Sequence, residues 1–463
     1  MNTMEEGTIM SAKSLSFLCP NGHLGFAPIK TGSFYRGISQ KPDFILADSG
    51  SDDIGPVPLG VDICASPLQW QKHDLEVMLV EARKLGVPMI IGSAGDTGTN
   101  SRVDMYVEII KELARKHKIP PFKLGYFYSE LGRDYLVRKI QNGQVLKGLD
   151  GRPDLTVEDI EKTDRVVAVA GVHPYIKLLE MGADVIIGGR SSDCAIFAAP
   201  ALRTGFPEEL CYYLGKVMEC ASFCCEPYGG KETIIGTITG EDVKVTAMHP
   251  EQRCTVASVA GHAMYERSNP YYEYVAGGML DMSNCKYEQH DEKTCRITGP
   301  KFVPADELRV KIEGAGKVGE RYVGIAGIRD PYTIQHIDKV IEWARQQAVE
   351  RFGDTGYELH YRVFGKNGVM GDLEPVKEIR SHELCVVVEG IAPTGEMAHE
   401  VCMTGTRQMF YARLPEVKGT AGGVAFVLDE VLPASPACAW TMNHTVPVAD
   451  PMELFKTNLI EVK

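Results

Sequence analysis

The sequence predicts an α/β fold: a parallel sheet with helices on both faces in the N-terminal half, followed by an α+β, strand-rich second half. Three observations predict it. Short, almost wholly apolar segments alternate with helical patterns up to about residue 230. Apolar strands of this kind are typical of parallel sheets that are buried on both faces. Beyond that point strand patterns broken by Gly and Pro dominate, and one long helical pattern interrupts them.

The expected strands of the first half are short apolar runs that end in glycine or polar residues. They are FILAD (44–48), VPMIIG (87–92), FKLGYFYS (122–129), RVVAVAG (165–171) and DVIIGG (184–189). The expected helices repeat apolar residues every three or four positions. They are 73–86, which ends at a glycine, 102–118, which has a basic C-terminus, 175–182, which glycine closes, and 194–202.

The second half adds strand patterns and a long helix at 332–353. Asp330 before Pro331 fits a helix N-cap, and KNG and GD in 361–372 are typical of a hairpin. We expect three segments: an α/β parallel-sheet domain with an acid-binding cleft, an α+β domain and a strand-rich C-terminal lobe. Their ranges are 1–230, 231–355 and 356–463.

Composition limits the classes of function. The 463 residues carry 49 basic and 62 acidic side chains, a net charge of −13, which argues against binding nucleic acid or an anionic membrane. No apolar run approaches the roughly 18 residues that span a bilayer, and the opening MNTMEEGTIMSAKS lacks the apolar core of an export signal. The 13 cysteines show no CxxC or zinc-ribbon spacing, so we expect reduced, mostly buried thiols in a cytoplasmic protein.

Polar loops follow four of the expected strands. They are DSGSDDIGP (48–56), GSAGDTGTN (92–100), GVHP (171–174) and GGRSSDC (188–194). Ligands of open parallel sheets bind outside the carboxyl ends of the strands, so we expect these loops to line one cleft. The same residue types also form ordinary turns and helix caps, and that alternative stands beside the cleft.

The candidate residues divide into two roles. Asp96, His173 and Asp193 are candidates for moving a proton. Backbone N–H groups, hydroxyls and guanidinium groups are candidates for holding an anionic substrate, with Arg190 as the expected anchor. The binding candidates are Gly92, Ser93, Gly95, Thr97, Gly98, Gly189, Arg190, Ser191, Ser192 and Arg329.

The sequence motifs give little indication of a bound nucleotide cofactor or metal ion. GSAGDTGTN lacks the GK[ST] ending of a P-loop, and the chain has no GxSxG elbow. We therefore predict no nucleotide cofactor. Asp48, Asp52 and Asp53 are candidate ligands of a divalent metal, although such a loop is more often a solvated turn. We interpret His262 as a packed or capping residue, and His444 has no evident partner.

Several long segments resemble one family. The segments are AGVHPYIKLLEMGADVIIGGRSSD, CYYLGKVMEC, YVAGGMLDMSNCKYE and VKIEGAGKVGERYVGIAGIRDP, within about residues 165–350. On these segments the chain resembles the acyclic terpene utilisation (AtuA) family. The resemblance implies work on branched or unsaturated acids or their CoA thioesters, by hydration or dehydration. The C-terminal part lacks the small ferredoxin-like domain of longer members, so the resemblance also implies a separate small subunit, and we expect a homo-oligomer.

Three hypotheses of function follow. The first is a hydro-lyase that acts on a small unsaturated carboxylic acid or acyl-CoA in catabolism. The second is a non-catalytic, acid-binding or regulatory subunit of a hetero-oligomeric complex. The third is a metal-assisted hydrolase that uses the acidic loop 48–53.

Overall fold

The computed structural model describes residues 14–265, 267–417 and 423–463, so the N-terminal segment in which we found no export signal lies almost wholly outside it. The chain forms two compact units, which we describe separately. Unit 1 holds the residues up to Ala315 and Trp440–Lys463, and unit 2 is Gly316–Ala439. This division differs from the expected boundaries near residues 230 and 355, because strands on both sides of residue 230 share one sheet.

A ten-stranded sheet forms the centre of unit 1, in the order β13-β14-β10-β9-β1-β2-β3-β8-β4-β22. The five neighbouring strands β1, β2, β3, β8 and β4 run parallel, as predicted for all of them except β1, which was not among the expected strands. The strands on either side of these five pair antiparallel. The parallel strands are β1 (Leu15–Cys19), β2 (Phe44–Gly50), β3 (Met89–Asp96), β8 (Val185–Ile187) and β4 (Phe122–Tyr128). The antiparallel strands are β9 (Ile234–Ile238), β10 (Val243–Ala247), β13 (Lys286–Gln289), β14 (Thr294–Thr298) and β22 (Lys456–Val462).

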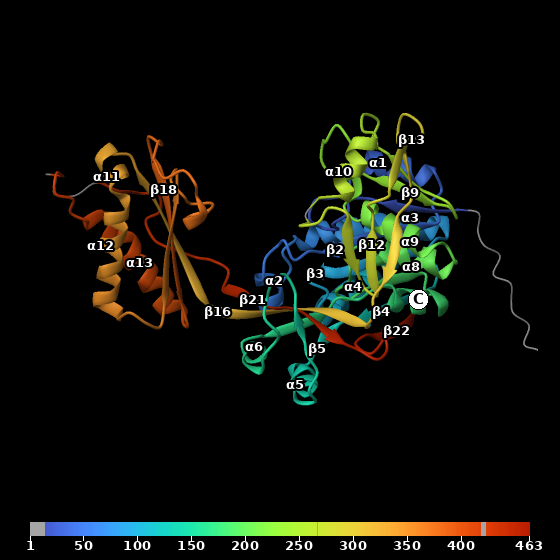
Figure 1. The fold of residues 1–463 in the computed structure, drawn as a ribbon, viewed down its shortest axis with the longest axis horizontal. Coiled ribbons are helices and arrows are strands. Elements are labelled where there is room, and N and C mark those ends of the chain that lie inside the picture. The colour runs from blue at the N-terminus through green and yellow to red at the C-terminus, as the bar shows by residue number, and fades with distance from the viewer. Residues whose placement is uncertain (1–13, 266, 418–422) are drawn as a thin grey trace, which may run out of the picture. The chain divides into compact units, whose positions relative to one another are not determined.

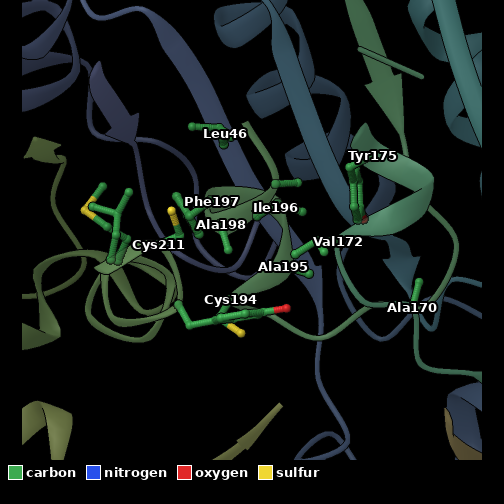
Figure 2. Packing of buried hydrophobic residues seen from close by; sticks show 14 of the residues in the cluster. Leu46, Ala170, Val172, Tyr175, Cys194, Ala195, Ile196, Phe197, Ala198 and Cys211 are labelled. Atoms are coloured by element: carbon green, nitrogen blue, oxygen red, sulfur yellow. The ribbon is translucent and has the colours of Figure 1, made fainter. Parts of the chain in front are cut away.

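Helices cover both faces of this sheet, as predicted. Alternate residues of β2 enter two different cores: Leu46 packs with Tyr175 and Ile196, while Ile45 packs with the opposite set of helices. Figure 2 shows part of the first core, with Leu46, Tyr175 and Ile196 labelled. The helices of unit 1 are α1 (Thr31–Ser39), α2 (Val57–Val61), α3 (Leu68–Leu85), α4 (Asn100–His117), α5 (Arg133–Gln141), α6 (Val157–Glu161), α7 (His173–Glu180), α8 (Ala195–Arg203), α9 (Glu208–Met218), η1 (Ala221–Cys224) and α10 (Val256–Ala263).

One strand of the first half does not join the parallel sheet. β7 (Arg165–Ala168) is a strand, as predicted, but it pairs antiparallel with β5 (Glu130–Leu131) and with the first part of β16 (Arg309–Ile328). Its placement in the parallel sheet was therefore wrong, because its partner lies far along the chain. The remaining strands of unit 1 are β6 (Lys147–Gly148), β11 (Tyr272–Val275), β12 (Gly278–Asp281), β15 (Lys301–Pro304) and most of β21 (Ala437–Pro447).

Unit 2 is an antiparallel sheet with helices on one face. The second part of β16 pairs with β18, and β18 pairs with β17 in the hairpin that the sequence predicted. Figure 1 shows α12 and α13 along the same face of this sheet, where they share one apolar core with it. The elements are α11 (Pro331–Gln335), α12 (Ile337–Phe352), β17 (Glu358–Phe364), η2 (Gly371–Leu373), β18 (Leu384–Ala392), α13 (Gly395–Tyr411), β19 (Ala425–Phe426) and β20 (Leu432–Pro433).

The long helix expected at 332–353 is two helices, α11 and α12, which meet at His336. Asp330 is the predicted N-cap: its carboxylate accepts hydrogen bonds from the backbone N–H and the hydroxyl of Thr333, each at 2.7 Å. Within the described residues no helix is long and apolar enough to cross a bilayer.

Candidate functional site

Charged side chains gather where β2, β3 and β8 end in unit 1. The predicted loops 48–56, 92–100 and 188–194 meet there. Strand β16 adds Lys311 and Glu313, two charged residues that were not among the predicted site residues. The start of the fourth loop also reaches this place, because Ala170 and Ser191 form an isolated parallel bridge. We call this set the carboxyl-edge cluster. It consists of Asp48, Asp52, Ser93, Arg190, Asp193, Lys311 and Glu313.

Arg190 lies at the centre of the cluster and is buried. Its Nε donates to Glu313 Oε2 at 2.8 Å, and its Nη2 donates to Oε1 at 3.3 Å. Nη1 donates to the Ser93 hydroxyl at 3.3 Å and lies 3.5 Å from Asp193 Oδ1. All three guanidinium nitrogens are thus engaged with this chain, and Arg190 could bind a substrate acid only by exchanging one of these partners. Its role as the substrate anchor stays a prediction.

Asp48 is 1% exposed and lies at the end of β2, where the register with β3 shifts. Its Oδ2 accepts from the backbone N–H of Gly50 at 2.9 Å, whereas its Oδ1 has no hydrogen-bond partner among the described residues. Burial raises the pKa of Asp48 to about 8, with a further rise from the charge of Asp193 and an opposing effect of Arg190. Asp48 is therefore protonated at neutral pH.

The glycines of these loops allow close approach of the neighbouring chain. A Cβ at Gly92 would lie 2.3 Å from Asp48 Oδ1, and a Cβ at Gly98 would lie 2.1 Å from the backbone N of Arg190. The backbone N–H groups that we expected to bind an anionic substrate are partly occupied within the protein, because those of Ser93 and Gly189 donate to backbone carbonyls. The hydroxyls of Ser93 and Ser191 are also engaged: that of Ser93 donates to Ser191 O, and that of Ser191 to Gly189 O. The glycine signal in the sequence is thus explained first by packing.

Asp193 is one of two accessible carboxylates of the cluster: its side chain is 44% exposed, and that of Asp52 is 51% exposed. Burial of the remaining part raises its pKa. Arg190 opposes that rise, while the charges of Asp52 and Glu313 add to it. Ser192 beside it has a hydroxyl that lies 3.2 Å from Cys194 Sγ. Asp193 therefore combines access to solvent with a pKa displaced toward neutral, which suits a group that exchanges protons.

Asp96 lies at the end of β3 and is held by several donors. Its carboxylate accepts from the Ser66 hydroxyl at 2.6 Å, from the backbone N–H of Ser66 and Ala65 at 3.0 and 2.9 Å, and lies 3.3 Å from His23 Nε2. Burial raises its pKa, but the hydrogen bonds from His23 and Ser66 outweigh burial and lower it. This arrangement fixes a loop and keeps Asp96 ionised. A catalytic role of Asp96 stays a prediction.

The other predicted residues lie in different surroundings. His173 begins α7, where burial lowers its pKa and Asp450 opposes that effect. Gly95 packs against Arg102, and the hydroxyl of Thr97 donates to that of Thr99. Arg329 is exposed and belongs to unit 2, so it is not part of the carboxyl-edge cluster.

The acidic loop sends its carboxylates to separate places. Asp48 is buried, Asp52 lies 3.6 Å from Lys311, and Asp53 is exposed. Within the described part of the chain these three do not form a group of ligand atoms within 4.8 Å of one another. The loop therefore offers no ready-made site for a divalent metal.

A cavity of about 250 Å³ in unit 1 adjoins the cluster. Its lining residues are Asp52, Asp53, Arg152, Glu313, Trp440, Met442 and Asn443. Arg152 is exposed and donates one N–H to the Trp440 carbonyl at 3.3 Å. Asn443 donates to Asp150 at 2.8 Å, while its buried Oδ1 has no hydrogen-bond partner among the described residues. The cavity thus offers a guanidinium and an amide oxygen to a small polar molecule.

Four residues of the cluster and the cavity were not predicted from the sequence: Lys311, Glu313, Arg152 and Asn443. Glu313 is 4% exposed, and Arg190 and Lys311 lower its pKa to about 2 against the effect of burial. The only signal in the sequence is VKIEG (310–314), in which charged residues alternate with apolar ones. Such alternation predicts a strand with one solvated face, so it did not suggest that either charge is buried. His444 does have a partner: its Nε2 lies 3.1 Å from the Pro153 carbonyl.

Comparison with known proteins identifies the family of this chain. The model of a family described as "Acyclic terpene utilisation family protein AtuA" matches residues 68–437, well beyond the segment 165–350 on which the resemblance rested. The match covers most of the chain, and the chain therefore belongs to the AtuA family. No curated protein and no solved structure matches it.

Proposed function

We propose that this AtuA family protein is a hydro-lyase that adds water to, or removes water from, a small branched or unsaturated carboxylic acid or its CoA thioester. Family membership supports a role in acyclic terpene utilisation. The observation that carries the reaction type is Asp193, an accessible carboxylate with a raised pKa in contact with a buried arginine.

The proposed chemistry is one proton transfer at each end of a carbon–carbon bond. In the dehydration direction Asp193 takes a proton from the carbon next to the acid or thioester carbonyl. The carbon–oxygen bond at the next carbon breaks and the double bond forms, and Asp193 passes the proton that it has taken to the departing hydroxyl, which leaves as water. A carboxylate with a pKa closer to neutral is the stronger base for the first step. In the hydration direction the protonated Asp193 returns the proton.

Arg190 and Asp48, the neighbours of Asp193, are proposed to control the orientation and the ionisation of its carboxylate and not to contact the substrate. Arg190 donates toward Asp193 and is itself held by Glu313, so it fixes the carboxylate in one orientation. Burial favours the protonated form of Asp48, and an uncharged Asp48 does not repel the charge of Asp193. Asp48 and Arg190 are thus positioning residues in this proposal.

Substrate binding is proposed in the 250 Å³ cavity. Asp52 and Glu313 line this cavity and also lie close enough to Asp193 to raise its pKa. Arg152 at its edge carries a guanidinium with one recorded hydrogen bond, and a carboxylate or thioester carbonyl can accept from its other N–H groups. We therefore place the acid anchor at Arg152 instead of Arg190.

The test is a screen of the full chain with 3-hydroxy and α,β-unsaturated acids and their CoA thioesters. Asp193→Asn should lower kcat by at least about 100-fold, because a general acid/base contributes roughly 100- to 10,000-fold. Asp134→Asn changes an exposed carboxylate of the first turn of α5 and is the matched control, which should keep its activity.

Two results would overturn the proposal. One is full activity of Asp193→Asn with the fold intact by circular dichroism. The other is thermal stabilisation by these acids without turnover, which would instead support an acid-binding or regulatory subunit.

Assembly and cofactor use form part of the same proposal. We propose self-association and a separate small subunit, which native mass spectrometry of the protein from its own cells tests directly. The proposed step uses no divalent metal. Turnover should therefore not rise when Mg²⁺ or Mn²⁺ is added, and a rise would favour the metal-assisted alternative.

A further inference from the structure

Three cysteines of unit 1 lie together away from the carboxyl-edge cluster. Cys224, Cys225 and Cys254 are buried, and their sulfur atoms all lie within 4.8 Å of one another. Cys225 Sγ and Cys254 Sγ are 3.4 Å apart, and all three are free thiols. Three thiolates around one zinc ion at Zn–S distances of about 2.3 Å are roughly 3.8 Å apart in tetrahedral geometry. The spacing therefore already approximates a metal site.

The backbone holds the two cysteine segments against each other. Glu226 and Arg253 form an antiparallel bridge in which each N–H donates to the other's carbonyl at 2.9 Å. Cys225 and Cys254 are the next residues on the two sides of this bridge. The hydroxyl of Ser258 in α10 donates to the Cys224 carbonyl at 2.8 Å, which ties the third cysteine to the same place. The sulfur atoms are thus positioned by the fold before any ion binds.

A lysine is fixed beside the cluster. The backbone N–H of Cys254 donates to the Lys293 carbonyl at 3.2 Å, and the Lys293 ammonium donates to the carbonyls of His249 and Gln252 at 3.2 and 2.8 Å. A neighbouring cation reduces the electrostatic cost of gathering three thiolates around one ion.

We propose that Cys224, Cys225 and Cys254 bind a zinc ion that fastens the η1 segment to the start of α10. Three thiolates are the ligand set of a Cys₃His structural zinc site. His262 in α10 is our proposed fourth ligand. It is buried, its Nε2 has no hydrogen-bond partner among the described residues, and its helix α10 contacts η1. Its ring nitrogens do not lie within 4.8 Å of all three sulfurs, so the side chain has to turn toward them when the ion binds.

The experiment measures metal directly in the full chain, purified under reducing conditions without added metal. Elemental analysis should give about one zinc per chain for the wild type and less than roughly a tenth of that for Cys225→Ser and Cys254→Ser. His262→Ala should retain zinc with at least about 10-fold weaker affinity in a chelator competition. Cys402→Ser is the matched control: Cys402 is buried in unit 2, outside the cluster, and its variant should keep its zinc.

A second measurement on the wild type alone guards against variants that do not fold. Zinc is removed with a chelator and Co²⁺ is added, and a thiolate-to-cobalt absorption band in the near ultraviolet supports the site. The proposal is overturned if the wild type contains no zinc and gives no such band, or if Cys225 and Cys254 are found oxidised to a disulfide. Retention of a cuprous ion in place of zinc would overturn the assignment of the metal.

Discussion

The two units of this protein each contain an arginine–glutamate pair, but the pairs differ in burial. In unit 1, the side chains of Arg190 and Glu313 are 8% and 6% exposed. In unit 2, Arg321 and Glu389 are 29% and 12% exposed, and Arg362, which also binds Glu389, is 57% exposed. A buried charge must be paired to be tolerated, whereas an exposed pair contributes little. The difference predicts that unit 1 is more sensitive to the loss of the Glu313 carboxylate than unit 2 is to the loss of the Glu389 carboxylate.

The largest effect is expected when the glutamate of each pair is replaced by glutamine, once in each unit. Glu313→Gln leaves Arg190 buried without its carboxylate and should lower the free energy of unfolding by about 3–5 kcal/mol. Glu389→Gln, the matched control, should cost less than about 1 kcal/mol because its partners stay solvated. Urea denaturation measures both. Equal losses would show that the two glutamates are equally important to the stability of their units.

A second comparison concerns glycine. Gly92→Ala in β3 places a methyl group 2.3 Å from the Asp48 carboxyl, so it should destabilise unit 1 by about 1–3 kcal/mol. In Gly395→Ala, at the start of α13, the new methyl group would lie 4.0 Å from its nearest neighbour, the ring of Tyr322. It should be neutral or stabilise unit 2 by up to about 1 kcal/mol. Thermal denaturation checks the opposite signs, and a harmless Gly92→Ala would contradict the tight packing around Asp48.

The third and smallest expected effect is a pH dependence. Asp48 keeps its proton in the folded state up to about pH 8 and loses it near pH 4 when unfolded. The unfolded state therefore binds fewer protons between these values, and the stability that the protonated Asp48 contributes falls as the pH rises. Asp48→Asn, which cannot ionise, should abolish this fall.

Subtracting the free energy of unfolding of Asp48→Asn from that of the wild type separates the contribution of Asp48 from those of other titrating groups. The free energy of unfolding of the wild type minus that of Asp48→Asn should fall by about 1 kcal/mol per pH unit between pH 5 and 7. The same difference for Asp372→Asn, an exposed residue of unit 2, should stay flat. A flat line for Asp48→Asn would mean that this carboxyl is ionised in the folded protein.

The sequence predicted those parts of the fold that depend on local pattern. The apolar strands 44–48 and 87–92 and the helix at 102–118 appear within a few residues of their expected limits, because periodicity is a local property. The partner of β7 could not be predicted, since β16 lies far along the chain and no local pattern encodes the pairing. The expected domain boundary at residue 230 likewise differs from the structure, because β9 and β10, which follow it in the chain, extend the ten-stranded sheet.

The site was predicted in part for the same reason. Arg190 and Asp193 follow a parallel strand, so the rule for strand ends found them. Glu313 could not be found this way, because it lies within a strand whose alternation hides its burial. Asp48 was interpreted as one of three acids in a solvated turn, but the register shift between β2 and β3 buries it alone. The cysteine cluster has ligands on two separate segments, so spacing rules for zinc motifs did not detect it.

The last strand, β22, has a consequence for the order of synthesis. It pairs with β4 along its whole length and forms the outer edge of the main sheet. A ribosome completes β4 long before the residues of β22 emerge, so the nascent chain carries an open strand edge throughout the translation of unit 2. Open edges recruit strands from other chains. A messenger truncated before Lys456 should therefore yield a product that needs chaperones to remain dispersed, even though all of the carboxyl-edge cluster has been made.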